Sequence, residues 1–366
     1  MKVLQVLPAL NSGGVERGAL DLARALVQRG HESLVMSSGG RMVAQLVAEG
    51  SRHIEFPVHE KSPRSLWRVR ALRRQLGELA PDIVHVRSRI PAWMVWLAVG
   101  RRPRQDRPAL VSTFHGLYSV SRYSAIMGCG DRVIAISHTV HDYIRDNYPQ
   151  VDPAKISVIH RGVDTRHFSR GNLPDPQWSE RFFSEYPRAA GKPLLLMPGR
   201  LSRWKGQIEF IELVAALRAR GTPCHGLVAG EPTPGKDDYL QELRELAQAR
   251  GLAEDVSFLG HRSDMENLYA VSAVVFNLSR HAEPFGRTVI EALAMGVPVV
   301  AYDYGGPAES LRDCLPEGLV PVGDGAALAE ATLRMLEAPP QIVLPRQFTL
   351  DAQVEATLAV YRDLLA

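Results

Sequence analysis

The sequence has no apolar run that is long enough to cross a membrane. Its best candidate, Pro91 to Val99, is far shorter than the roughly 20 residues that a spanning helix needs. An apolar segment also opens the chain, but Pro8 and the polar stretch from Asn11 to Gly14 interrupt it within a few residues. The opening segment is therefore typical of a buried strand and not of a signal peptide.

Cysteine is scarce as well, which argues against a disulfide-rich secreted domain. The three cysteines, Cys129, Cys224 and Cys314, are widely separated and lack the spacing of a metal site. No Asp-x-Asp motif follows a predicted strand, so the sequence indicates no metal ligand set. We expect reduced thiols, a cytoplasmic protein and no bound metal.

Positive charge is abundant but unevenly distributed. The 366 residues carry a net charge of +3. Residues 1–170 contain 25 lysines and arginines against 14 aspartates and glutamates, whereas the remainder contains 18 against 26. The excess in the first part includes three arginine clusters: Arg64, Arg68, Arg70, Arg73 and Arg74; Arg87 and Arg89; and Arg101, Arg102, Arg104 and Arg107.

These clusters allow two interpretations. Any one arginine is best explained as part of a solvated helix face. Three clusters within one domain instead favour a surface that meets anionic lipid, at the inner face of the cytoplasmic membrane, or a phosphorylated acceptor. Nucleic acid is a weaker candidate, because no aromatic platform or known binding motif accompanies the arginines.

Short apolar runs alternate with amphipathic segments twice over, which predicts an α/β protein with two tandem doubly wound domains. Strands are expected at 3–7, 34–36, 83–86, 110–114, 133–136 and 156–159, and again at 194–197, 227–229, 256–259, 274–276, 299–302 and 319–322. A proline-rich segment, 164–178, reads as the linker. We predict a first domain over 1–168, a second over 169–349, and a C-terminal helix over 350–366.

The loop after the first predicted strand contains two adjacent glycines, Gly13 and Gly14, just before a predicted helix. A dinucleotide-binding fingerprint would need G-x-G-x-x-G and an acidic residue after the second strand, where Ser37 and Ser38 stand instead. A nicotinamide-dependent enzyme is therefore disfavoured. A plain strand-to-helix turn remains the alternative to a ligand site.

The segment around Glu283 has the most informative pattern. Pro284 and Gly286 keep Glu283 outside a short helix that is predicted from about Arg287 to Met295. Glu291, one turn into this helix, leans back toward its start, where free N–H groups favour an anion. Two carboxylates would repel a phosphate, but they suit sugar hydroxyls while the helix and separate cations hold the phosphate. The pattern indicates a nucleotide-sugar site.

The same segment, with Pro-Phe-Gly after the first glutamate, resembles the EX7E signature of retaining glycosyltransferases of the GT-B fold, in particular family 4. The resemblance extends over nearly the whole chain. It implies two Rossmann-like domains that face a cleft, a C-terminal helix that crosses back to the first domain, and a role in bacterial envelope polysaccharide or lipopolysaccharide synthesis.

The resemblance also implies a phosphate clamp. Arg200 and Lys205, which follow the first strand of the second domain, match a Gly-Arg…Lys-Gly element whose cations neutralise the leaving diphosphate. Fixed cations are how metal-independent enzymes stabilise the charge that builds on a leaving oxygen. Alone, the two residues would be ordinary surface charges. His115, at a strand end, matches a histidine that contacts the donor sugar, with a packed histidine as the alternative.

Other residues match the family elements that bind the nucleotide-sugar. They are Gly13, Gly14, His261, Arg262, Phe285, Gly286, Arg287, Thr288 and Glu291. The resemblance implies that His261 and Arg262 bracket the base, Glu291 holds the ribose and Glu283 holds sugar hydroxyls. Arg287 departs from the family, since many members have an apolar residue there.

We therefore expect a retaining glycosyltransferase with a nucleoside-diphosphate-sugar donor, a lipid-linked or envelope glycan acceptor, and neither cofactor nor metal. No second carboxylate is placed as an acid, so attack on the same face as the leaving group is favoured over a nucleophilic carboxylate. Two alternatives remain. An epimerase of the same fold would carry added acid–base residues, and a non-catalytic nucleotide-sugar-binding protein would lose the clamp charges.

Overall fold

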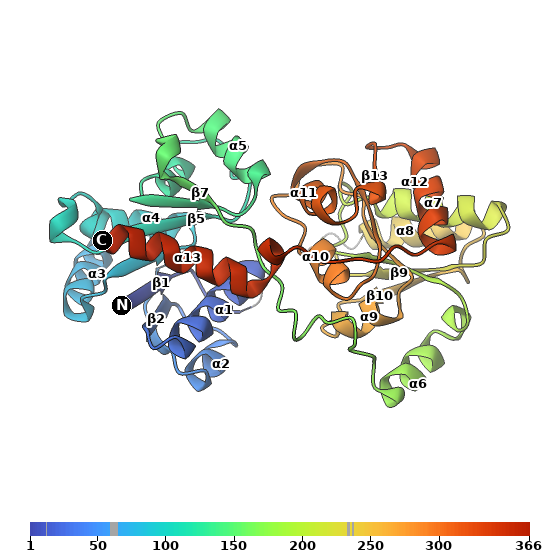
Figure 1. The fold of residues 1–366 in the computed structure, drawn as a ribbon, viewed down its shortest axis with the longest axis horizontal. Coiled ribbons are helices and arrows are strands. Elements are labelled where there is room, and N and C mark those ends of the chain that lie inside the picture. Colours follow the sequence, from blue (N-terminus) through green and yellow to red (C-terminus); the bar gives the residue numbers. More distant parts are fainter. Residues whose placement is uncertain (12, 59–64, 233–234, 236–237) are drawn as a thin grey trace. The chain divides into compact units, whose positions relative to one another are not determined.

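A computed structural model describes residues 1–11, 13–58, 65–232, 235 and 238–366. The chain forms two compact units, the first made of Met1–His160 with Asp351–Ala366 and the second of Arg161–Leu350 (Figure 1). The division precedes the predicted boundary of 168/169 by a few residues. Residues 161–168 join the second unit because Val163 bridges to Thr349 and the Phe168 ring lies 6.0 Å from that of Tyr269.

The first unit is built on a parallel seven-stranded sheet in the order β3-β2-β1-β4-β5-β6-β7. The strands are β1 (Lys2–Val6), β2 (Glu32–Ser37), β3 (Arg52–Glu55), β4 (Ile83–Val86), β5 (Ala109–Phe114), β6 (Arg132–Ala135) and β7 (Ile156–Val158). Every residue of β5 is buried, including Ser112 and Thr113, whose hydroxyls have hydrogen-bond partners in Met127 and His85. β3 was not predicted, because this edge strand buries only Ile54.

Helices cover both faces of this sheet. They are α1 (Gly14–Gln28), α2 (Val43–Ala48), α3 (Ser65–Leu79), α4 (Arg89–Val95) and α5 (His138–Asn147), and α4 continues as a π-helical turn, Trp96–Gly100. The sequence analysis did not predict α4, whose first turn contains Pro91. Proline is tolerated there because the first N–H groups of a helix have no partner within it. None of the helices in the described ranges has the length and apolar composition that a bilayer span requires.

The second unit repeats the plan with a parallel six-stranded sheet in the order β10-β9-β8-β11-β12-β13. The strands are β8 (Leu194–Pro198), β9 (His225–Ala229), β10 (Val256–Gly260), β11 (Val274–Asn277), β12 (Val299–Tyr302) and β13 (Leu319–Val320). The helices are α6 (Pro176–Glu185), α7 (Gln207–Ala219), α8 (Asp238–Ala249), α9 (Met265–Val271), α10 (Arg287–Ala294), α11 (Gly305–Cys314) and α12 (Gly325–Glu337). The prediction of two doubly wound α/β units is confirmed.

Both sheets reverse the direction of strand addition at one point, between β1 and β4 and between β8 and β11. The loops that leave the carboxyl ends of two such strands turn to opposite faces of the sheet. A crevice is left between them, and side chains of both loops can line it. In the second unit, the loops after β8 and β11 carry the predicted clamp and Glu283.

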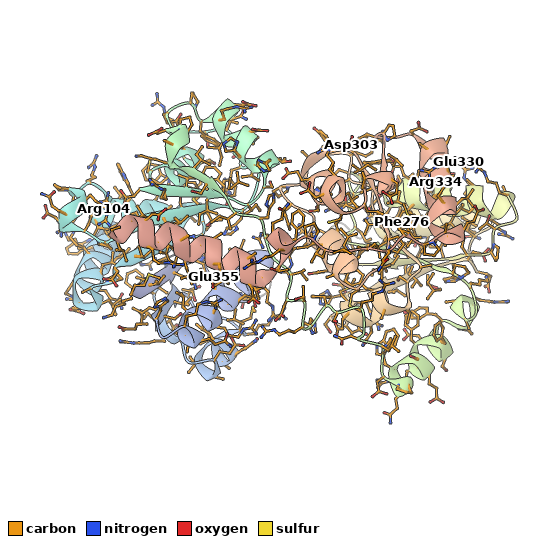
Figure 2. All side chains as sticks on the ribbon, viewed as in Figure 1. Arg104, Phe276, Asp303, Glu330, Arg334 and Glu355 are labelled. Carbon is orange, nitrogen blue, oxygen red and sulfur yellow. The ribbon has the colours of Figure 1, made fainter. Side chains whose placement is uncertain are left out.

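The last helix, α13 (Leu350–Leu365), belongs to the first unit. The buried Tyr361 hydroxyl lies 2.6 Å from His85 Nδ1, and the other ring nitrogen of His85 lies 2.6 Å from Thr113 Oγ1. Burial, reinforced by Arg87, holds the pKa of His85 well below its usual value, so the ring is neutral. Figure 2 shows Arg104 near the carboxyl end of α13, where it donates to the Leu364 carbonyl.

Tyr361→Phe should weaken the attachment of α13. The change removes only a hydroxyl, but it leaves His85 Nδ1 buried without its partner, which costs about 1–3 kcal/mol. We expect faster hydrogen exchange of the α13 amides. Tyr304→Phe, at a half-exposed position of the second unit, is the control and should leave that exchange unchanged. Native protection of α13 in Tyr361→Phe would contradict a structural role for this bond.

Candidate functional site

The loop between β8 and α7 carries Arg200 and Lys205, and glycine fixes its path. Gly206 has a left-handed backbone (φ +87°), and a Cβ there would collide with the carbonyl of Leu278, the residue that follows β11. Only glycine permits this approach without strain. The contact brings the end of the loop against the end of β11.

Lys205 and Glu283 form an ion pair at this junction. The ammonium Nζ lies 2.7 Å from Glu283 Oε1, and both side chains are largely buried, with 19% and 13% exposure. Asn277 Nδ2 donates to the same oxygen at 3.1 Å, and the Ser279 hydroxyl donates to it as well. No described residue donates to Oε2, so one carboxylate oxygen is held and the other is available to a ligand.

The backbone of Glu283 is held from the opposite side by the start of α11. The N–H of Gly306 donates to the Glu283 carbonyl at 2.8 Å, and a Cβ on Gly305 would crowd the same residue. A Cβ on Gly306 would crowd Phe285. The sequence analysis missed this support, although the Gly-Gly-Pro that follows β12 was a visible signal of close backbone packing.

Helix α10 begins after Gly286 and carries Glu291 on its buried side. Gly296 ends it in the left-handed conformation (φ +75°), directly after the predicted end at Met295. Glu291 Oε2 accepts from the hydroxyl of the buried Tyr269 at 3.1 Å, and Oε1 lies 3.0 Å from a guanidinium nitrogen of Arg287. Burial first, and the Glu291 carboxylate second, raise the pKa of Tyr269 well above its usual value, so it remains a hydrogen-bond donor.

Arg287 therefore has a local partner, because it lies one turn from Glu291 on the same helix face. Phe285 is buried before the helix, and Thr288 lies in its first turn, half-buried. No carboxylate occupies the first turn of α10, whose N–H groups point out of the helix. An anion there would be favoured by the helix dipole.

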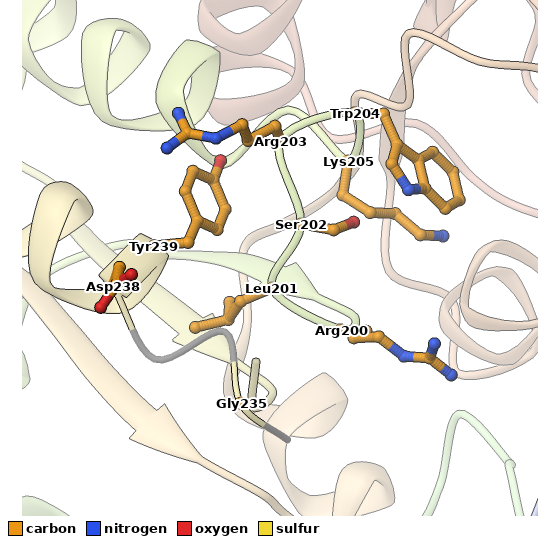
Figure 3. A pocket seen from close by; sticks show the side chains of 9 residues that line it. All are labelled: Arg200, Leu201, Ser202, Arg203, Trp204, Lys205, Gly235, Asp238 and Tyr239. Carbon is orange, nitrogen blue, oxygen red and sulfur yellow. The ribbon is translucent and has the colours of Figure 1, made fainter. Parts of the chain in front are cut away.

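A cavity of about 850 Å³ lies along the loop after β8. Figure 3 shows Arg200 and Lys205 extending to one side of the loop, with Arg203 and Tyr239 on the other. Arg203 pairs with Glu242 (2.7 Å) and lies over the Tyr239 ring. Arg200 is exposed and forms no ion pair within the described part of the chain. Arg200 and Lys205 are thus the pair that faces the same side.

His261 and Arg262, the two residues expected to bracket the nucleotide base, follow β10. Arg262 makes two hydrogen bonds to Asp264, at 2.9 and 2.6 Å, and Trp178 donates to the same carboxylate at 2.6 Å. Burial alone would raise the pKa of Asp264, but the hydrogen bonds from Arg262 and Trp178 outweigh it and lower the pKa. Arg262 is thus rigidly placed, whereas His261 is exposed.

The first unit carries the remaining predicted residues. Gly13 caps α1 at φ +146°, Gly14 begins the helix, and a Cβ on Gly13 would collide with the Glu16 carboxylate. That carboxylate therefore lies over the start of the helix. His115 follows β5, and its N–H lies 3.3 Å from the Tyr118 hydroxyl.

Several arginines of the three clusters make contacts within the fold and are not simply exposed charges. Arg107 pairs bidentately with Asp131 (2.7 and 2.8 Å), Arg73 donates to two backbone carbonyls, and Arg89 lies over the Tyr118 ring. These three arginines contact other parts of the fold, so fewer arginines of the clusters are available to form a binding surface. Arg64 lies outside the described residues.

No group of three or more histidines, cysteines and carboxylates suited to a metal ion occurs among residues 1–11, 13–58, 65–232, 235 and 238–366.

Two family models match the chain. The model described as Glycosyltransferase Family 4 matches residues 12–167, and that described as Glycosyl transferases group 1 matches residues 179–349. The second contains Arg200, Lys205, Glu283 and Glu291.

Curated relatives have related names. The D-inositol 3-phosphate glycosyltransferase of Salinispora tropica is 28% identical over 78% of this chain and 64% of its own length. The chain thus aligns with less than two thirds of that protein. The phosphatidyl-myo-inositol mannosyltransferase of Mycobacterium leprae is 28% identical over 88% of this chain and 84% of its own length. The lipopolysaccharide core biosynthesis mannosyltransferase of Rhizobium meliloti is 27% identical over 57% of this chain and 61% of its own length.

Solved structures share the fold over the whole chain. A glycosyltransferase from Rickettsia africae is 29% identical, with a TM-score of 0.83 over 100% of this chain and 98% of the other. An Anabaena protein solved with UDP and glucose is 21% identical, with a TM-score of 0.77 over 99% of this chain and 100% of the other. The chain belongs to the glycosyltransferases of the GT-B fold, with a family 4 domain followed by a group 1 domain.

Proposed function

We propose that this glycosyltransferase moves a sugar from a nucleoside-diphosphate-sugar to an acceptor with retention of configuration and without a metal. The observation that carries the proposal is the meeting of Lys205 and Glu283 where the order of the second sheet reverses. A cation suits a diphosphate, and the uncommitted Oε2 of Glu283 suits a sugar hydroxyl. The Anabaena neighbour, solved with UDP and glucose, supports a donor of this class.

The environment of Glu283 favours same-face attack over a covalent intermediate. Its Oε1 already accepts from Lys205, Asn277 and Ser279, and these donors withdraw charge from the carboxylate. A carboxylate held in this way is a poor nucleophile but a well-oriented hydrogen-bond acceptor. We therefore assign Glu283 to the sugar hydroxyls, and the leaving diphosphate accepts the proton of the acceptor.

Cations and helix α10 stabilise the leaving group in this proposal. Arg200 and Lys205 face one side of their loop, and the free N–H groups of α10 lie beyond Gly286. Together they neutralise the charge that develops on the diphosphate, so the reaction needs no metal. Glu291 holds the ribose, with its carboxylate oriented by Tyr269. For His115, the proposed role remains the contact with the donor sugar that the family resemblance implies.

The relatives argue against both alternatives. Their names are those of transferases and synthases, which support neither an epimerase nor a non-catalytic binding protein. Two act, by their names, on inositol 3-phosphate and on phosphatidyl-myo-inositol. We propose a lipid-linked or envelope glycan acceptor, and contact of the first unit with an anionic membrane surface.

The membrane contact is assigned to helix α3. Trp67 is 73% exposed there, and the guanidinium of Arg70 lies 5.5 Å from its ring. An exposed tryptophan beside arginines suits the interface between lipid head groups and acyl chains. Arg73 is excluded from this surface, because it donates to the carbonyls of Leu97 and Ala98.

Arg200→Ala or Lys205→Ala should weaken both nucleoside-diphosphate binding and turnover, each by about 2–4 kcal/mol, because the leaving group loses a cation. Calorimetric titration and initial rates measure the two effects. Arg203→Ala is the matched control, since this neighbour points to the other side of the loop and pairs with Glu242. Unchanged binding in both clamp variants would remove the assignment. Loss of native activity in EDTA, restored by manganese, would overturn the metal-free mechanism.

Glu283→Gln should remain measurably active, with turnover reduced by about 10²–10³-fold, because glutamine keeps one carbonyl acceptor and most of the shape. The product from an α-linked donor should be α-linked, as judged by NMR of the anomeric proton. A nucleophilic glutamate predicts a different outcome. Mass spectrometry of native enzyme without acceptor would then show a covalent glycosyl adduct on Glu283.

Arg68, Arg70 and Arg74 changed together to glutamine should reduce binding to anionic vesicles by at least about tenfold, since each cation near such a surface contributes about 1 kcal/mol. Co-sedimentation with vesicles measures the effect, and added salt should mimic it in the native protein.

A triple variant of Arg218, Arg220 and Arg250 in the second unit removes the same charge and should bind like the native protein. Equal binding of native protein to neutral and anionic vesicles would show that the α3 arginines are only solvated.

A further inference from the structure

Arg87 is placed where a ligand site is expected in the first unit. It follows β4, and its N–H donates to the carbonyl of Val6 at 3.0 Å, so it continues the pairing of β4 with β1. The order of the sheet reverses between these two strands. Arg87 therefore lies at the edge where doubly wound units bind ligands, next to the strand that ends before His115.

Its side chain is buried but makes little use of its hydrogen-bonding capacity. Only 4% of Arg87 is exposed. Its Nε–H donates to Gln5 Oε1 at 2.8 Å, and Gln5 is itself fixed by a bond to the Ala19 carbonyl. Gln5 is neutral, and no other hydrogen bond or ion pair of the Arg87 side chain occurs within the described ranges. A guanidinium has five N–H donors, so four remain.

No carboxylate among the described residues pairs directly with Arg87. Asp21 is close enough to act on Arg87 electrostatically, but it pairs with Arg24 at 3.3 Å. Tyr361 is a neutral phenol, because burial raises its pKa. Burial lowers the pKa of Arg87 itself to about 10, although Tyr361 and Asp21 oppose the shift. A buried charge without a partner is destabilising, and natural proteins retain such groups chiefly where they function.

Arg107 in the same unit shows what a structural arginine looks like. It precedes β5, at the opposite edge of the sheet, and Asp131 meets it with two hydrogen bonds of 2.7 and 2.8 Å. In the described part of the chain, Asp131 thus pairs directly with Arg107, whereas no carboxylate forms such a pair with Arg87.

We propose that Arg87 binds a phosphate group, and that this group is carried by the acceptor. The planar fork of a guanidinium matches two phosphate oxygens, and the phosphate charge compensates the buried cation. The link to the acceptor rests on the proposed transferase function, whereas the phosphate site itself does not. The phosphate can be free or attached to a lipid, and these sources are separated by experiment.

The test compares native protein with Arg87→Met in titrations with inorganic phosphate and with phosphatidic acid in neutral detergent micelles. We expect phosphate to raise the melting temperature of the native protein, and its dissociation constant to increase at least about tenfold in Arg87→Met. Tighter binding of phosphatidic acid than of inorganic phosphate identifies a lipid-linked group, and the reverse identifies a free phosphate. Absence of both effects in native protein overturns the proposal.

Three variants make the result specific. Arg52→Met removes the same charge from exposed strand β3 and should leave phosphate binding unchanged. Arg200→Ala disables the donor clamp, so the effect of Arg87→Met on phosphate binding should persist in this background, which separates the two sites. Arg87→Lys keeps the charge and should retain weakened binding.

Stability gives an independent readout. Without phosphate, Arg87→Met should melt at or above the native temperature, because it removes an uncompensated buried charge. A lower melting temperature together with native phosphate affinity would show that Arg87 is only structural, and would overturn the proposal.

Discussion

The second unit depends on one ion pair, between Lys205 and Glu283, that joins two loops from neighbouring strands. Gly206 makes the pair possible, because its missing Cβ lets the loop after β8 reach the residue after β11. The pair then neutralises two charges that would be costly to bury separately. Asn277 and Ser279 complete the arrangement by holding one oxygen of Glu283. The result is a cation and a carboxylate oxygen presented together, which is the combination that a sugar diphosphate requires.

The elements that bury continuous apolar runs were predicted from the sequence, and those that rely on tertiary contacts were not. Strand β8 was recognised because its five buried residues form an apolar run, and helix α10 because its apolar residues recur at helical spacing. Strand β3 was missed because it buries one residue, and α11 because Gly-Gly-Pro reads as a turn until Glu283 is seen to pack against it. The pattern around Glu283 identified the glutamates, but not their contacts. Tyr269, Asn277 and Ser279 have no distinctive spacing, so only the fold reveals them.

The two units use charge in different ways. In the second unit, each glutamate of the site meets a basic partner, Lys205 for Glu283 and Arg287 for Glu291. In the first unit, arginines are in excess, but many of them hold backbone carbonyls or carboxylates, as Arg73 and Arg107 do. For this reason, the count of arginines in the sequence overestimates the number that is available at a basic surface. The other arginines of the first unit include an exposed group on α3 and one buried guanidinium at the ligand edge.

In the proposed function, the Lys205–Glu283 arrangement forms part of a nucleotide-sugar site. A thermal-shift screen of the native protein with UDP, GDP and ADP tests it most directly. We expect one nucleotide, at about 100 times its dissociation constant, to stabilise the protein by about 2.7 kcal/mol, and the corresponding nucleotide-sugar to stabilise it as well. If none of the three nucleotides and their sugars shifts the unfolding transition, Lys205 and Glu283 do not form a nucleotide-sugar site.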